Sequence, residues 1–210
     1  MPDRLIAALV LAAGASSRMG RPKAALPLGP GLGTVLSRGV ATLLAAGVPR
    51  VVVVAGAHPD AVREALDGTD ARVSVVDNPA WAVGQLSSLI CGLNAVDDGR
   101  LEAVLMTLVD VPLVAPATVR HLIDTWRETR APIVRPARGD MHGHPVLFDR
   151  RIFAELRAAD PTSGAKPVVH AHAHEIVNVA VDDEGAFLDL DTPEDYARAL
   201  ALAARLSIGD

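Results

Sequence analysis

The sequence predicts a three-layer α/β fold, in which a mostly parallel β-sheet carries helices on both of its faces. Strand-like and helix-like segments alternate along the first half of the 210-residue chain. Four such strand–helix units in succession require parallel strands joined by crossover helices. The strand-like segments are continuous apolar runs, which are typical of strands covered on both faces.

The first half contains the elements of the parallel sheet. Ile6–Leu11 is an apolar run followed by a Gly/Ser loop, so it predicts a buried strand. In Thr34–Ala46 leucines and valines recur at helical spacing, and Gly47 supplies a stop signal. Pro116 stands at a first helical position, where its missing N–H costs nothing. The other expected strands are Val51–Ala55, Val73–Val76 and Ala103–Val109, and the other expected helices are Pro59–Leu66, Leu86–Val96 and Thr118–Glu128.

The pattern loosens in the second half, where we expect a small antiparallel elaboration. Two short strands, Ile133–Arg135 and Pro145–Phe148, flank a polar turn rich in glycine and histidine. Thr192 is a good N-cap and Pro193 a good first residue for a terminal helix that reaches about Leu206. The remaining expected elements are short helices at 151–158 and 165–172 and a strand at Ile176–Val181.

Length and composition exclude several classes of protein. A chain of this length is expected to form one domain, and half of its residues are hydrophobic, which supports a packed core. Cys91 is the one cysteine, so a disulfide scaffold and a cysteine zinc site are excluded and a reducing, cytoplasmic setting is expected. No apolar run is long enough for a membrane helix. The net charge of -5 argues against a nucleic-acid partner.

The charges are unevenly distributed along the chain. Between Arg4 and Pro59 there is no Asp or Glu, whereas several arginines and one lysine fall there. The acids crowd near the end, from Asp182 to Asp195. This distribution favours an anion site that also holds a divalent cation, although ordinary surface charge would also account for it.

The loop after the first strand, LAAGASSRMGRPK at residues 11–23, has the residues of a phosphate-binding loop. Its small residues let backbone N–H groups approach a ligand closely. Arg18 and Lys23 add two cations, and Ser16 and Ser17 add hydroxyls. The loop is neither a Walker A motif nor GxGxxG. Lys23 is one of two lysines in a chain with 18 arginines, which suggests a need for a compact point charge.

Five segments along the chain form a recognisable series: LAAGASSRMGRPK (11–23), NPAWAVGQLSSL (78–89), TLVDVP (107–112), GHPVLF (143–148) and LDLDTPEDY (188–196). They resemble segments of the nucleotidyltransferases that use a Rossmann-like GT-A fold, in particular the molybdenum cofactor cytidylyltransferase and guanylyltransferase family. They occur in the family's order and span nearly the whole chain. The resemblance implies transfer of a nucleoside monophosphate from an NTP to a phosphorylated acceptor, molybdopterin, with release of pyrophosphate. A molybdoenzyme that receives the product is an implied partner.

The resemblance also implies roles for individual residues. Lys23, Arg18 and Asp110 are the expected catalytic residues, and Asp110 and Asp191 the expected ligands of Mg²⁺, with Mn²⁺ as the alternative. The acceptor is expected at Gly143, His144 and Pro145. The expected nucleotide-binding residues are Leu11, Ala12, Ala13, Gly14, Ala15, Ser16, Ser17, Arg18, Lys23, Asn78, Gly84, Ser87 and Ser88.

The expected domain spans 1–210, with a nucleotide-binding half at 1–115 and an acceptor-binding half with the terminal helix at 116–210. By resemblance, the LAAG form of the loop looks closer to the CTP-using members of the family, whereas GTP users tend to show LAGG. The extra methyl of Ala13 would narrow the base site and favour the smaller pyrimidine. Two other functions stay open: a GTP-using or sugar-phosphate nucleotidyltransferase, and a catalytically idle nucleotide-binding chaperone for a molybdoenzyme.

Several of these residues have a plain structural alternative. Asp110 is also a turn former, and Asp191 belongs to the capping sequence of the last helix. His144 is also a candidate for a buried structural histidine, and Trp81 is expected to pack within its loop. The run His170, His172, His174 falls in a predicted helix, which scatters the rings, so solvated histidines are expected there and not a zinc site.

Overall fold

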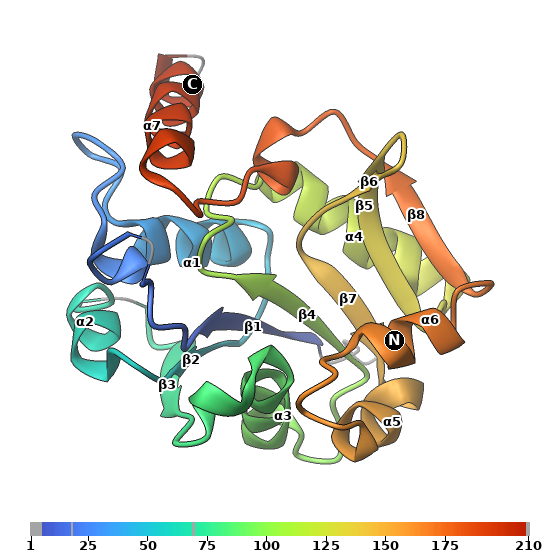
Figure 1. Cartoon of the computed structure of the whole chain (residues 1–210). Helices are drawn as coiled ribbons and strands as arrows, with labels where there is room; N and C mark the ends of the chain where they lie inside the picture. The colour runs from blue at the N-terminus through green and yellow to red at the C-terminus, as the bar shows by residue number, and fades with distance from the viewer. Residues whose placement is uncertain (1–5, 18, 69, 209–210) are drawn as a thin grey trace.

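The computed structural model describes residues 6–17, 19–68 and 70–208, and it confirms the predicted fold class. Within these residues one 8-stranded sheet has the order β3-β2-β1-β4-β7-β5-β6, with β8 paired to β5 (Figure 1). The strands are β1 Ile6–Ala12, β2 Val51–Ala55, β3 Val73–Asp77, β4 Ala103–Leu108, β5 Ile133–Arg138, β6 Met141–His142, β7 Val146–Asp149 and β8 Ile176–Ala180. The helices are α1 Val35–Ala45, α2 Pro59–Glu64, α3 Gln85–Val96, α4 Pro116–Thr129, α5 Phe153–Ala158, α6 Lys166–Ala171 and α7 Pro193–Ile208.

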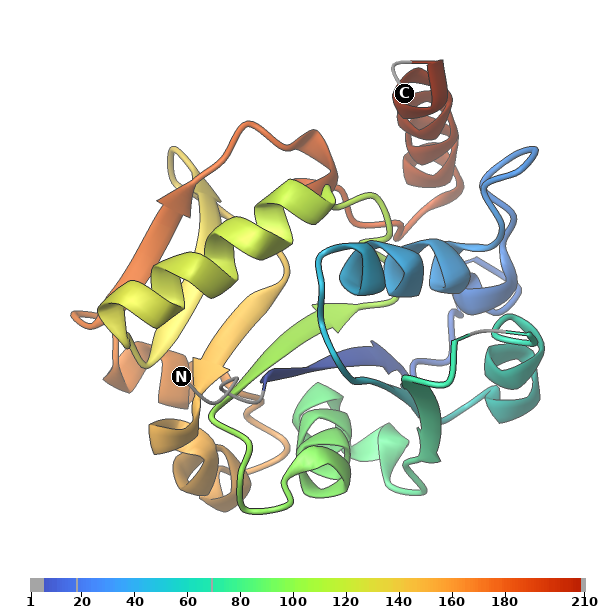
Figure 2. The ribbon, with the colours of Figure 1, turned by 180° about the vertical axis from the view of Figure 1, so that it is seen from behind.

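Strands β3, β2, β1 and β4 form the parallel part of the sheet that the alternating pattern predicted. Every residue of β1 and β2 is buried, because helices cover both faces of these central strands. On one face Leu36 of α1 and Trp126 of α4 pack in a common core with Val53. On the other face Leu89 of α3 and Phe153 of α5 pack in a second core. The two layers of helices are visible in both views of the ribbon (Figure 1 and Figure 2).

The antiparallel elaboration is also confirmed. Strand β7 pairs antiparallel with both β4 and β5, and β8 runs parallel to β5. The polar turn between the two predicted strands contains a further strand, β6, which pairs with the last residues of β5. Strand β4 ends at Leu108, one residue earlier than expected, because the chain turns and Val111 N–H donates to the Leu108 carbonyl at 3.2 Å.

The last helix holds the preceding segment against the end of the sheet. Thr192 caps α7 as expected: Asp195 N–H donates to Thr192 Oγ1 at 3.2 Å, and Thr192 N–H donates to Asp195 Oδ2 at 3.1 Å. Leu202 on α7 is buried with Leu28 and Leu190 in a third apolar cluster. The start of α7 is therefore anchored, while its far end projects from the body of the molecule (Figure 1).

Asp149 is a buried acid whose loss should be costly. The residue is 3% exposed, and its Oδ2 accepts the indole N–H of Trp126 at 2.8 Å. Arg151 N–H donates to its Oδ1 at 3.0 Å. Asp149→Ala should lower the free energy of unfolding by about 2–4 kcal/mol, because it leaves the buried indole N–H without an acceptor. Urea unfolding measures this, with Asp149→Asn as the milder comparison; equal losses in both variants would contradict the hydrogen-bond account.

The three neighbouring histidines do not form a metal site among the described residues. Instead, His172 lies between two acids: its Nε2 is 2.9 Å from Glu155 and its Nδ1 is 3.0 Å from Glu175. The hydrogen bonds to Glu175 and then to Glu155 raise the pKa of His172 above its ordinary 6.5. Charged His172 is therefore stabilised by folding.

This arrangement predicts a pH-dependent contribution to stability. Because the pKa is raised, the stabilisation is fully present below the ordinary pKa of 6.5 and is lost as the pH rises through the raised value. His172→Gln should cost about 0.5 kcal/mol near pH 6, a small value because solvent screens this surface pair, and close to nothing near pH 9. Thermal unfolding at the two pH values checks this; an equal loss at both would exclude the ionic contribution.

Candidate active site

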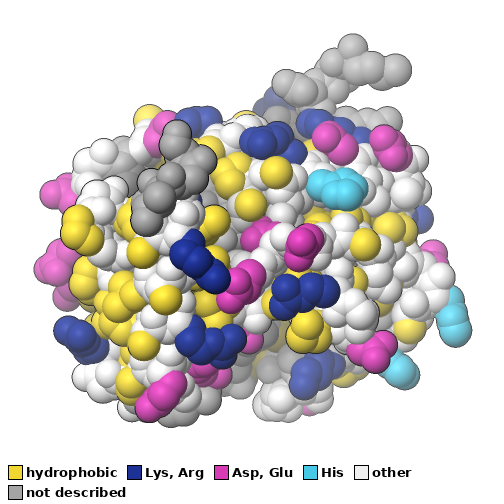
Figure 3. Space-filling view, turned by 90° about the horizontal axis from the view of Figure 1, so that it is seen from above, with side chains coloured by type: hydrophobic (Ala, Val, Ile, Leu, Met, Phe, Trp, Pro, Cys, Tyr) yellow, Lys and Arg dark blue, Asp and Glu magenta, His cyan; other side chains and the backbone are white. Residues whose placement is uncertain are grey.

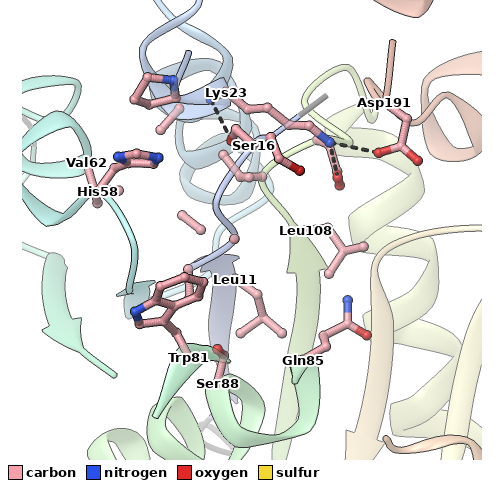
Figure 4. A pocket seen from close by; sticks show the side chains of 18 of the residues that line it. Leu11, Ser16, Lys23, His58, Val62, Trp81, Gln85, Ser88, Leu108 and Asp191 are labelled. Carbon is pink, nitrogen blue, oxygen red and sulfur yellow. Dashed lines mark hydrogen bonds and ion pairs between the residues drawn. The ribbon is translucent and has the colours of Figure 1, made fainter. Parts of the chain in front are cut away.

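A cavity of about 310 Å³ opens where β1 and β4 end, and it collects most of the predicted site residues (Figure 4). The predicted residues that line it are Leu11, Ala12, Ala13, Gly14, Ser16, Ser17, Lys23, Gly84, Ser88, Asp110 and Asp191. Sequence reasoning did not assign eight other lining residues to the site: Pro22, Ala24, His58, Val62, Trp81, Gln85, Leu108 and Val109. Arg18 lies outside the described residues.

The loop after β1 contains backbone donors without partners among the described residues, and three of its residues, Gly14, Ser16 and Ser17, line the cavity. In the described part of the chain the N–H groups of Gly14–Ser17 make no hydrogen bond to protein atoms. Ser16 has a positive φ of 52°, which is uncommon for a residue other than glycine. Its Oγ accepts the N–H of Lys23 at 3.1 Å, so the turn also sets the position of that lysine. Four consecutive donors beside a cavity form a site for an anion such as a phosphate.

Lys23 joins two carboxylates that are far apart in the sequence. Its Nζ is 2.9 Å from Asp110 Oδ2 and 2.8 Å from Asp191 Oδ1 (Figure 4). Burial lowers the pKa of Lys23, but the hydrogen bonds and charges of Asp191 and Asp110 outweigh it, and the pKa lies above its ordinary value. Lys23 is therefore charged at neutral pH.

Backbone pairing brings the two acids together. Asp110 follows β4, and its carbonyl accepts the N–H of Leu190 at 2.9 Å, which lays the segment before α7 along this end of the sheet. Asp189 lies in the same segment, and its pKa is raised first by loss of solvent and then by repulsion from Asp110 and Asp191. The acid-rich end and the cationic start of the chain thus meet, and both signs of charge gather on the face seen from above (Figure 3).

The two carboxylates fit a hard divalent cation. Asp110 Oδ1 is buried and accepts no hydrogen bond among the described residues, so one acceptor is available for a ligand. Mg²⁺ and Mn²⁺ prefer oxygen ligands, and Mg²⁺ in particular takes one or two carboxylates and completes its shell with water and substrate phosphates. No group of three or more metal-binding side chains is present in the described part of the chain. Asp110 and Asp191 would therefore hold the ion together with phosphate oxygens.

The opposite wall of the cavity carries rings. His58 and Trp81 lie on the far side of the loop from the Lys23 ammonium (Figure 4). His58 Nε2 is 3.1 Å from the Ala15 carbonyl. A Cβ at Gly56 would lie 2.6 Å from both the Ala13 carbonyl and Trp81 Cβ, so only glycine allows this close packing. Trp81 thus packs as expected but also lines the cavity. The signal that could have identified His58 as a site residue is its position shortly after β2, at the same edge of the sheet.

Two expected nucleotide-binding residues, Asn78 and Ser87, do not line the cavity. Asn78 is 4% exposed, and its Nδ2 donates to Ser87 Oγ at 2.9 Å and to Ser88 Oγ at 3.0 Å. The Asn78 Oδ1 accepts the N–H of Ala80 at 3.0 Å. These bonds tie the end of β3 to the start of α3 and so position Ser88, which does line the cavity. Ala15, at the loop's outer turn, is likewise absent from the lining.

The structure does not bring the three expected acceptor residues to the cavity wall. Gly143 packs against Ala186: a Cβ there would lie 2.2 Å from the Ala186 carbonyl. His144 donates its N–H to the same carbonyl at 2.9 Å, and burial lowers the pKa of its ring. Pro145 lines a separate, small apolar cavity. The contacts of these residues are those of packing, which agrees with the structural alternative for His144.

A parallel sheet whose carboxyl edge offers free amides, a lysine and paired acids is suited to proteins that act on nucleoside triphosphates. Residues 8–176 match the family described as the MobA-like NTP transferase domain, and the chain belongs to this family. The predicted resemblance is thereby confirmed.

Among the helices of the described residues, none combines the length and the apolar character that a membrane span requires.

Individual relatives extend this match over more than nine tenths of the chain. A molybdenum cofactor cytidylyltransferase of Escherichia coli is 25% identical over 91% of this chain and 93% of its own length. A molybdenum cofactor guanylyltransferase of Cereibacter sphaeroides is 31% identical over 92% of this chain and 95% of its own. The crystal structure of Rv0371c from Mycobacterium tuberculosis aligns with a TM-score of 0.79 and 36% identity over 96% of this chain and all of that one. The crystal structure of Rv0371C from Mycobacterium tuberculosis in complex with manganese aligns with a TM-score of 0.74 and 35% identity, over 94% of this chain and 98% of that one.

Proposed function

We propose that this protein transfers CMP from CTP to the phosphate of molybdopterin and releases pyrophosphate. The observation that carries the proposal is the position of Lys23, which bridges Asp110 and Asp191 near the N–H groups of Gly14–Ser17, for which the described part of the chain offers no acceptor. Such a site matches the charge of a triphosphate and of the metal ion that accompanies it. Relatives named cytidylyltransferase and guanylyltransferase support the acceptor. The enzyme is proposed to act in the cytoplasm and to pass its product to a molybdoenzyme.

In the proposed reaction an acceptor phosphate oxygen attacks the α-phosphorus of the NTP, and the bond from the α-phosphorus to the bridging oxygen breaks. The N–H groups of Gly14–Ser17 hold the triphosphate, and Lys23 stabilises the charge that develops on the α-phosphate. Arg18 is proposed to bind the leaving pyrophosphate. Mg²⁺ or Mn²⁺, held by Asp110 and Asp191, would supply neutralisation of the phosphate oxygens. A manganese complex of a similar structure supports a metal of this kind.

The proposed halves contribute unequally to the cavity. All of its lining residues come from 1–115 except Asp191. This supports the first half as the nucleotide-binding part, to which the segment before α7 returns one metal ligand.

CTP is proposed over GTP because the loop has Ala13, which lines the cavity, at the position where the GTP-using LAGG form has glycine. Ala13 is 6% exposed, and it packs closely against Gly56. In this proposal the methyl of Ala13 leaves less room for a purine than glycine would. A guanylyl transfer is the alternative, since relatives with that name reach similar identity.

Pyrophosphate release with each of the four NTPs, with and without molybdopterin, tests the proposal. We expect turnover only with acceptor present and fastest with CTP. Ala13→Gly should raise the rate with GTP relative to CTP. Ala12→Gly, at the last residue of β1, serves as the matched control and should leave this ratio unchanged. Faster turnover of GTP by the unchanged protein would assign a guanylyltransferase. Nucleotide binding without any pyrophosphate release would favour the idle chaperone, and turnover only with a sugar phosphate would replace the acceptor.

A further inference from the structure

His58 lines the nucleotide cavity, but no step of the proposed reaction uses it. It stands at the N-cap position of α2, where its carbonyl accepts the N–H of Val62 at 3.2 Å. Its side chain makes no capping hydrogen bond to the described residues of that helix. The imidazole therefore does not serve to begin α2, and its contact with the neighbouring loop needs another explanation.

The segment after β2 extends the pairing of the sheet onto the loop after β1. The two strands are paired in parallel up to their last residues. Beyond that point Ala57 N–H donates to the Ala13 carbonyl at 3.0 Å, and His58 Nε2 lies 3.1 Å from the Ala15 carbonyl. Because a carbonyl oxygen only accepts, the Nε2 of His58 carries a proton and donates it to this bond. Residues 57 and 58 thus hold alternate carbonyls of the loop.

The bond to His58 also sets the direction of the next N–H group. The peptide between Ala15 and Ser16 is trans, so its C=O and its N–H point in opposite directions. With the Ala15 carbonyl held toward His58, the N–H of Ser16 points away from the imidazole. This N–H makes no hydrogen bond to the described protein atoms, so it is available to a ligand.

The peptide needs such a restraint because the backbone of Ser16 is strained. Its φ of 52° lies in the left-handed region, which residues other than glycine rarely adopt. Rotation of the peptide between Ala15 and Ser16 by about half a turn would bring φ of Ser16 into the extended region and relieve the strain. The rotation would also turn a carbonyl oxygen to the side where the N–H now points, and the partial negative charge of that oxygen repels a phosphate.

Among the described residues, His58 makes the one hydrogen bond that holds the carbonyl of this peptide. The hydroxyl of Ser16 accepts the N–H of Lys23 at 3.1 Å, and its own carbonyl accepts the N–H of Met19 at 3.0 Å. Both of these bonds involve atoms that follow the peptide in the chain. They therefore leave the peptide free to rotate, whereas the rotation would break the bond between His58 and Ala15.

We propose that His58 is a positioning residue for the phosphate-binding loop: its Nε2–H holds the Ala15 carbonyl and thereby keeps the Ser16 N–H turned to the triphosphate. The inference rests on the proposed function, because it concerns the same loop. The Lys23 ammonium lies on the far side of the loop from His58, which is the side to which the Ser16 N–H is turned (Figure 4). A backbone donor there adds to the loop N–H groups that bind an anion.

Binding of inorganic tripolyphosphate to the full-length protein at fixed Mg²⁺ tests the inference. His58→Leu should raise the dissociation constant about 10-fold, the loss expected for one hydrogen bond to a charged group. His58→Gln, whose amide offers an N–H at a similar reach, should stay within about threefold of the unchanged protein. His121→Leu replaces an exposed histidine of α4 and should change nothing. Unchanged binding by His58→Leu, or equal losses in the Leu and Gln variants, would overturn the inference.

A second comparison separates control of this peptide from a general disturbance of the loop. Glycine adopts a positive φ without strain, so in a Ser16→Gly protein the rotation is no longer favoured. Adding His58→Leu to that protein should raise the dissociation constant for tripolyphosphate by less than about threefold. A loss as large as in the protein with Ser16 would mean that His58 does not act through this peptide.

The same variants distinguish this inference from the proposed function. If molybdopterin supports turnover, His58→Leu should raise the KM for the NTP about 10-fold and leave the KM for the acceptor unchanged, and an equal rise in both would refute the inference. If no acceptor supports turnover, the proposed function fails, and the dissociation constants for tripolyphosphate alone decide the role of His58. An unchanged protein that binds no tripolyphosphate would refute both.

Discussion

Lys23→Met should reduce kcat/KM for nucleotidyl transfer by about 10³-fold. The ammonium is the cation that the structure places between the loop donors and both aspartates, and methionine keeps the length of the side chain without its charge. Without it, the α-phosphate loses its point charge, and Asp110 and Asp191 lose the ammonium that they share. Initial rates of pyrophosphate release at subsaturating NTP, with the acceptor saturating, measure the loss.

Two comparisons make this result specific to Lys23. Arg21→Met removes an exposed cation of the same loop that does not line the cavity, and it should change kcat/KM less than twofold. Lys23→Met should also bind Mn²⁺ more tightly than the unchanged protein in the absence of nucleotide, because the competing ammonium is gone. A loss of less than tenfold in kcat/KM would remove Lys23 from the mechanism.

Asp110→Asn should abolish turnover to a similar degree, about 10³-fold, and the loss should not be recovered at high Mg²⁺. The amide preserves the shape of the side chain and one oxygen, but it removes the charge from the buried Oδ1, which accepts no hydrogen bond from the residues that the structure describes. Nucleotide affinity without metal should change little, since the loop N–H groups remain. Titration of activity with Mg²⁺ and with Mn²⁺ provides the measurement.

Asp189→Asn is the matched control for Asp110. This carboxylate lies near the same charges but does not line the cavity, so its loss should leave the dependence on metal concentration unchanged. If Asp110→Asn retained more than a tenth of the activity with an unaltered metal dependence, the ion would have to be held elsewhere.

Elements with local signals were predictable from the sequence. The valine run Val51–Ala55 forms β2 with the expected bounds, since a continuous apolar run needs only to be buried on both faces. Thr192 caps α7 because its bonds reach only three residues ahead. The small strand β6 was not expected, because two exposed residues carry no apolar periodicity and are held by pairing with β5.

The candidate site, like the fold, has features that the local sequence predicts and features that depend on the tertiary structure. The sequence by itself determined the residue types: a loop of small residues, a rare lysine and acids that follow strands. Only the tertiary structure decided which of them meet, because Lys23 is 87 residues from Asp110 and 168 from Asp191, and the contacts depend on the order of strands and on the pairing of Leu190 with Asp110. The tertiary structure also decided which expected residues pack away from the cavity. Gly143, for example, packs against Ala186, which is far from it in the sequence. Whether a residue is buried depends on the segment that packs against it, and the local sequence around that residue does not reveal which segment this is.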